Sequence, residues 1–230
     1  MKKLLLILLC LPMIGFGQNL TIGDTYQGGI IFYLDGNGGG LIAAPSDQST
    51  GGVEWGCYGT NIPGASGTAI GTGYQNTLDI INAGCISING SSTAAAICTN
   101  LTLGGYSDWF LPSKDELNAM YLNIGQGSPL GNLGSFSTNY YWSSTEYDFE
   151  RACNQALGIG YQANGYKLSS STNVRSVRAF SGSGQLTYVP DDNFESYLEA
   201  NGMGDGIIFN DSVPTASIEM VMLLNISGIN

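Results

Sequence analysis

The segment GYSDWFLPSKDELNAMY, residues 105–121, supports the firmest structural predictions for this chain. Ser113 and Glu116 have the S-x-x-E spacing of a capping box, which predicts a helix that begins just after Ser113. Apolar residues at 117, 120, 121 and 124 then recur with helical periodicity as far as Gly125, where we expect the helix to end. Trp109 and the two residues after it directly precede this helix. We expect them to enter the core, with ligand stacking by Trp109 as the alternative.

Runs of β-forming residues on both sides of this segment predict antiparallel strands. The runs at 30–34 and 41–44 flank a glycine-rich turn and predict a hairpin. A strand is expected from Tyr140 to Ser144, and alternation at 157, 159 and 161 leads to Asn164-Gly165, which predicts a second hairpin turn. VRSVRAF, residues 174–180, predicts a strand that ends a sheet. Because acidic residues far outnumber basic ones, Arg175 and Arg178 in this segment each have an acidic neighbour available. We expect Arg178 to be buried and paired with a carboxylate or with backbone carbonyls, with an exposed ligand-binding arginine as the alternative.

Two further short helices are predicted between the first hairpin and the opening segment. Thr77 is expected to cap the first, which contains Leu78 and Ile81. In the second, apolar residues from 94 to 101 lie at helical spacing, with Cys98 on the apolar face. The predicted fold class is therefore α+β, with antiparallel strands and hairpins and two or three short helices.

The N-terminus has the pattern of an export signal. Lys2 and Lys3 precede an apolar run at 4–14 and small residues at 15 and 17, so residues 1–17 are predicted to be a cleaved signal peptide. Cleavage would remove two of the seven Lys and Arg and none of the 18 Asp and Glu, leaving a net charge of −13. We expect a secreted or cell-surface protein that neither binds nucleic acid nor inserts into a membrane after signal removal.

Histidine and cysteine usage narrows the chemistry. The chain has no histidine, which excludes Ser-His and Cys-His catalytic pairs and His-ligated zinc. Four cysteines remain after signal removal, an even number that predicts two disulfides in an exported chain. Three pairings are open, and we favour Cys85 with Cys98 and Cys57 with Cys153, because the first pair is close in sequence.

Acidic residues after the Trp142 strand form a candidate cation site. Glu146, Asp148 and Glu150 alternate, so in an extended conformation they would share one face. Calcium accepts such oxygen ligands in loose geometry, which makes it the one candidate cofactor, while a solvated loop is the alternative. The turn with Asp35 and Asn37 is a second candidate calcium loop, although the same residues are typical of a bare turn.

Three ordered motifs carry a resemblance to a known family. GYSDWFLPSKDEL, YYWSSTEY and VRSVRAF resemble the Lcl C-terminal domain family and the related Fibrobacter major-paralogue domain, over about residues 22–180. The resemblance implies a C-type-lectin-like fold for residues 18–181 and an exported binding or adhesion module. It does not imply a calcium-dependent sugar site, since the Trp142 strand reads WSS and no EPN or QPD motif is present.

A second resemblance follows a linker at 182–186. Residues 187–230 look like the N-terminal cap and opening strand of a bacterial leucine-rich-repeat domain. Asp192 and Glu195 have capping-box spacing, and Gly202 would end the helix. A solenoid needs about three or more repeats to bury its core, so we expect this cap to be incomplete.

These observations predict a non-catalytic recognition or adhesion module whose ligand is an extracellular glycan or protein. The candidate ligand-binding residues are Trp109, Trp142, Glu146, Asp148 and Glu150. One alternative is a structural module without a ligand of its own. Another is a glycosidase that uses two carboxylates chosen from Glu54, Asp108, Glu146, Asp148 and Glu150.

Overall fold

The computed structural model describes residues 20–49, 51–88, 90–181, 186–188, 196–198 and 212–214. The expected signal peptide at 1–17 and most of the expected repeat cap at 187–230 lie outside this range. Within it, β8 (Leu186–Tyr188) pairs antiparallel with β9 (Ser212–Pro214), and residues 196–198 are helical.

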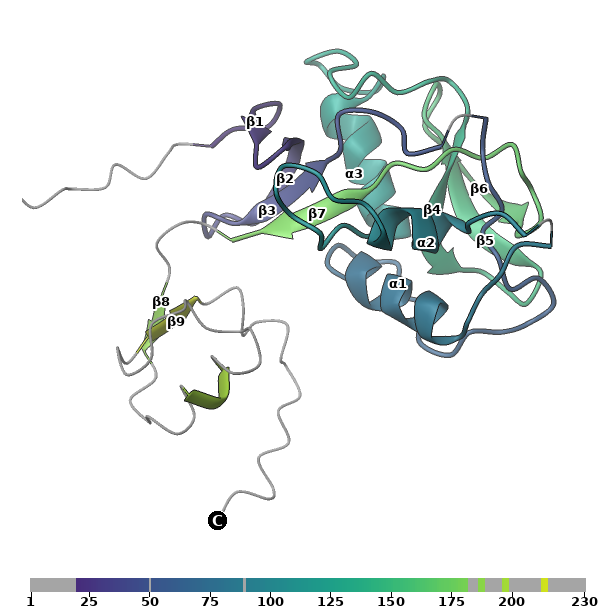
Figure 1. Ribbon diagram of the computed structural model, residues 1–230. Helices are drawn as coiled ribbons and strands as arrows, with labels where there is room; N and C mark the ends of the chain where they lie inside the picture. Colours follow the sequence, from purple (N-terminus) through teal and green to yellow (C-terminus); the bar gives the residue numbers. More distant parts are fainter. Residues whose placement is uncertain are drawn as a thin grey trace, which may run out of the picture.

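The first sheet joins the beginning and the end of the 20–181 region. It contains β1 (Thr25–Tyr26), β2 (Gly29–Leu34), β3 (Gly40–Ala43) and β7 (Val177–Phe180) in the order β1-β2-β3-β7, all antiparallel (Figure 1). The predicted hairpin is confirmed as β2 and β3. The predicted closing strand is confirmed as β7, which lies at the edge of this sheet.

The second sheet contains β4 (Tyr140–Glu146), β5 (Arg151–Ala156) and β6 (Tyr161–Tyr166). The predicted turn at Asn164-Gly165 is wrong, because both residues lie inside β6, opposite Cys153 and Ala152 of β5. The chain turns instead between Ala156 and Tyr161. Gly165 has a packing role: a Cβ there would lie 3.0 Å from the Trp142 ring and 2.5 Å from the Asn154 amide nitrogen.

Three short helices complete this region: α1 (Gly73–Asn82), α2 (Ala94–Thr99) and α3 (Lys114–Ile124). The capping box is confirmed, since the Ser113 hydroxyl accepts from the Glu116 N–H while the Glu116 carboxylate accepts from the Ser113 N–H. The expectation that Thr77 caps α1 is wrong. Thr72 occupies the N-cap, and the buried Thr77 hydroxyl donates to Gly73 O and accepts from the Leu111 N–H, which ties α1 to the opening segment.

Helix α3 packs between the two sheets, in contact with β2 of the first and with β4 and β5 of the second (Figure 1). Its apolar face is buried, as the periodicity predicts, at Leu117, Met120 and Ile124. Each sheet therefore covers one side of this helix. The described part of residues 20–181 is an α+β arrangement of two antiparallel sheets and three short helices.

Two arginines of the closing segment are buried in ion pairs, as predicted for Arg178. The Arg178 guanidinium pairs with Asp108, donates to the Gln27 side chain and lies 3.7 Å from the Tyr106 ring centroid. Arg175 lies 2.6 Å from Asp47 and also donates to two backbone carbonyls. With Lys167, which is also buried, three of the five Lys and Arg residues that the structure describes are internal.

The predicted disulfide pairing is wrong. Cys57 is bonded to Cys85, whereas Cys98 and Cys153 are buried free thiols. Helix α2 turns Cys98 into the core, as its apolar periodicity predicted. Burial raises the pKa of the Cys98 thiol to about 12, so the group stays protonated at neutral pH.

Candidate functional site

The three alternating carboxylates after the Trp142 strand do not share a face, which corrects the predicted cation site. Strand β4 ends at Glu146, and residues 147–150 form the turn to β5, so the extended alternation stops. Glu146 points inward, where its carboxylate lies 2.5 Å from the Lys167 ammonium and accepts from the Ile62 N–H. Asp148 and Glu150 remain in the turn, each with a different partner.

Asp148 and Glu150 organise the surface of that turn. Asp148 accepts two hydrogen bonds from the Arg151 guanidinium, at 2.9 and 2.6 Å, and two from backbone N–H groups of the turn. The bond from Arg151 holds the pKa of the Asp148 carboxyl below its usual value. Glu150 accepts a bond from the Tyr58 hydroxyl at 3.0 Å, which raises the pKa of that hydroxyl and keeps it protonated.

Four exposed aromatic side chains lie in the segments that carry these charges, and we call them the aromatic patch. Tyr58 lies in the loop before α1, Tyr147 and Phe149 in the β4–β5 turn, and Tyr166 at the end of β6. Their exposed fractions are 39%, 55%, 50% and 60%. Large rings are costly to leave in water, so a group of them on one surface indicates a binding site.

Arg151 links three parts of the patch. Its guanidinium lies 4.9 Å from the Tyr147 ring centroid, and it is the cross-strand partner of Tyr166. The Tyr58 loop joins the turn through the Gly59 N–H, which donates to the Phe149 carbonyl at 2.8 Å. The patch is therefore assembled from three segments that are far apart in the sequence.

The loop that carries Tyr58 is held in place by a disulfide and by a buried lysine. The Cys57–Cys85 disulfide closes it, and Gly56 lies where a Cβ would come within 2.7 Å of Thr93 and 3.2 Å of the Cys85 Cβ. The buried Lys167 ammonium also donates to the Thr60 carbonyl at 2.9 Å. A fixed loop lowers the entropic cost of binding at Tyr58.

The same disulfide anchors a second exposed apolar segment. Ile86 and Ile88, just after Cys85, are 79% and 74% exposed. The Ile88 N–H donates to the buried Glu54 carboxylate at 2.9 Å, so this segment is also held in place. The disulfide therefore joins two loops that both carry exposed apolar side chains.

The other predicted site residues lie in the interior or in structural contacts. Trp109 and Trp142 are buried, and their ring N–H groups donate to backbone carbonyls, so neither ring is available to a ligand. Of the glycosidase candidates, Glu54 is buried and Asp108 is paired with Arg178. Asp35 accepts from the N–H groups of Asn37 and Gly39, as in an ordinary turn. Among the described residues, no group of three or more acidic or cysteine side chains is placed to hold a metal ion.

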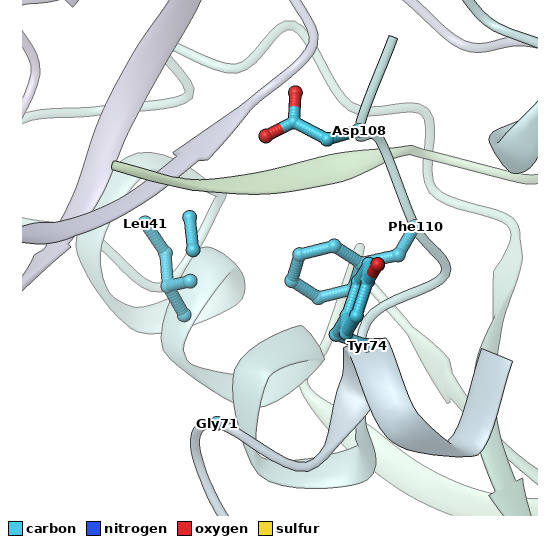
Figure 2. A pocket seen from close by; sticks show the side chains of 6 residues that line it. Leu41, Gly71, Tyr74, Asp108 and Phe110 are labelled. Atoms are coloured by element: carbon cyan, nitrogen blue, oxygen red, sulfur yellow. The ribbon is translucent and has the colours of Figure 1, made fainter. Parts of the chain in front are cut away.

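A small cavity of about 190 Å³ opens beside the first sheet. It is lined by Leu41, Gly71, Tyr74, Asp108, Phe110 and Ala179. Figure 2 shows the Asp108 carboxylate on the other side of a strand from the Leu41, Tyr74 and Phe110 side chains, so these side chains leave the cavity apolar. Because apolar walls offer little to orient a ligand, the aromatic patch, with rings and charges together, is the stronger candidate.

Sequence reasoning identified the acidic residues of the turn but missed the rings between them. In TEYDFE, residues 145–150, aromatic and acidic residues alternate directly after a predicted strand, and that pattern was the available signal. Nothing local marked Tyr58 or Tyr166, because the disulfide and the strand register bring them to the turn.

Among the described residues, no helix has both the length and the apolar character needed to cross a membrane. No protein-family model matches the chain, and the search of curated proteins found no match.

Proposed function

We propose that this chain is a non-catalytic recognition module of the bacterial cell surface or of secreted material, and that the aromatic patch is its ligand-binding site. The observation that carries this proposal is that Tyr58, Tyr147 and Tyr166, all exposed, lie against Glu150 and Arg151 in segments that are held in place. The N-terminal export pattern supports the location. The two antiparallel sheets around α3 are compatible with the lectin-like fold that the sequence motifs suggest.

The expected ligand is an extracellular glycan. Aromatic rings pack against the C–H faces of sugar rings, burying apolar surface, while carboxylates and guanidinium groups bond to the hydroxyls. The patch offers both kinds of group: the Tyr58 hydroxyl bonds to Glu150, and the Arg151 guanidinium lies against the Tyr147 ring. No chemical step is assigned to these residues: Asp148 is paired with Arg151, and Glu150 accepts a bond from Tyr58.

A protein ligand is the second candidate, and Ile86 and Ile88 favour it. Two isoleucines with so much exposed surface, next in the chain to the cysteine that is bonded to the Tyr58 loop, resemble the apolar centre of a protein interface. This candidate is separated from the first by changing Ile86 and Ile88 to serine. Such a variant should lose a protein partner but keep binding to a glycan that contacts only the rings.

A glycan array probed with wild type and two matched variants tests the proposal. Tyr161 and Tyr166 lie at opposite ends of β6 and are equally exposed, at 60%, but only Tyr166 belongs to the patch. We expect Tyr166→Ala to weaken binding by at least about fivefold, the effect of one contact worth more than about 1 kcal/mol. Tyr161→Ala should bind like wild type. Equal losses in both variants would show that the patch is not the site.

A further inference from the structure

The charges of the patch define which glycans it can accept, an inference that rests on the proposed function. Its charged side chains are one cation, Arg151, and two carboxylates, Asp148 and Glu150. Arg151 is already committed to Asp148 through two hydrogen bonds. The remaining charge at the centre of the patch is the carboxylate of Glu150.

Glu150 is placed to serve as the polar anchor of a ligand. Its Oε1 accepts from Tyr58, which fixes the side chain between two parts of the patch. Among the residues that the structure describes, no hydrogen bond reaches its Oε2. Asp148, in contrast, uses both oxygens within the turn. A ligand donor would therefore be received at Oε2 of Glu150, and the strongest such donor is cationic.

Most of the other cations of the chain are not available to offset this preference. Outside the N-terminal export pattern the chain has five Lys and Arg residues, all of them within the described region. Lys167, Arg175 and Arg178 are buried in ion pairs, and Arg151 is paired at the surface. Lys114, in the first turn of α3, is the fifth. A chain with a net charge of −11 and so few exposed cations repels sulfated and uronic-acid glycans.

We propose that the aromatic patch binds amino sugars that carry a free ammonium group, with one sugar ring against the exposed tyrosines and the ammonium at Glu150. Neutral sugars with the same backbone bind more weakly, through the rings alone. Anionic sugars are excluded.

Three β-1,4-linked glucose tetramers that differ only at C2 make a matched test. Their C2 groups are hydroxyl, N-acetyl and free ammonium, and galacturonic acid tetramer serves as the anionic probe. Calorimetry of the full chain at a slightly acidic pH, where the amine is protonated, should give the tightest binding for the ammonium form and none for the anionic probe. Added salt should weaken binding of the ammonium form more than that of the other two.

Two charge variants identify the group responsible. Glu150→Gln keeps the side-chain shape and an acceptor for Tyr58, so the preference for the ammonium form should fall by about five- to tenfold. Asp35→Asn removes one charge from the turn between β2 and β3 and should leave the preference unchanged. Binding through Tyr166 with equal affinity for all three tetramers would overturn this inference while leaving the recognition site standing. Failure of Tyr166→Ala to weaken any tetramer would overturn the glycan site itself.

Discussion

Lys167→Met is the substitution whose cost follows most directly from the structure. The Lys167 ammonium is fully buried, 2.5 Å from Glu146, and lies 4.8 Å from the Trp55 ring centroid. Methionine keeps most of the apolar stem but leaves the Glu146 carboxylate, 9% exposed, with only the Ile62 N–H as a partner. Removal of one member of a buried ion pair costs about 3–5 kcal/mol. At roughly 2–4 °C per kcal/mol for a chain of this size, the melting temperature should fall by roughly 6–20 °C.

The loss can be followed by tryptophan fluorescence, because all three tryptophans are buried in the described region. Denaturant unfolding of the full chain should show a lower midpoint with an unchanged slope. A double variant, Lys167→Met with Glu146→Gln, removes the stranded charge and should recover at least about 1 kcal/mol relative to the single variant. A single variant that unfolds within about 0.5 kcal/mol of wild type would refute the reasoning, since that is the usual range for surface changes.

Three further predictions concern the Arg178–Asp108 ion pair, the buried Glu116 carboxyl of the capping box, and the free thiols of Cys98 and Cys153. Arg178→Ala should lower the free energy of unfolding by about 2–3 kcal/mol in the same denaturant assay, less than for a fully buried pair because Asp108 is half-exposed, and a wild-type midpoint would contradict this. Burial raises the pKa of the Glu116 carboxyl in the folded state, so the folded protein holds this proton more tightly than the unfolded chain does. The contribution of Glu116 to stability should therefore decline as the pH rises through the raised pKa. The stability advantage of wild type over Glu116→Gln, measured by unfolding at about pH 4 and pH 7, should thus be larger at the lower pH, and a constant difference would exclude this linkage. Cys98 and Cys153 should resist a thiol reagent at neutral pH until the protein unfolds, and rapid labelling of the native state would show that they are accessible.

Local signals in the sequence predicted the local structure well. The helix from Lys114 to Ile124 is marked by its own cap and periodicity, and the β2–β3 hairpin by its own turn, so neither depends on distant residues. The turn predicted at Asn164-Gly165 was wrong because the role of this glycine depends on a distant residue. Its glycine is needed because the Trp142 ring packs against β6, a contact between residues far apart in the sequence.

The candidate site depends on long-range contacts and was predicted only in part. Cys57 and Cys85 are separated by 28 residues, and spacing alone does not reveal that these two cysteines pair. The acidic residues of the turn were predicted because they alternate in the sequence. Glu146 nevertheless lies in the core, because it pairs with Lys167, the residue that follows β6. The rings of the aromatic patch are brought together by strand register and a disulfide, so the sequence next to each ring does not indicate the patch.

Protein-observed NMR of the tyrosine ring signals tests the central claim most directly. The full chain would be titrated with the ligand that binds best on the glycan array, and ring signals would be assigned with single Tyr→Phe variants. The account predicts that the signals of Tyr58, Tyr147 and Tyr166 shift together, while those of Tyr161 and of Tyr74 beside the apolar cavity stay in place. Shifts confined to Tyr74, or to Tyr161, with the patch unchanged would contradict it.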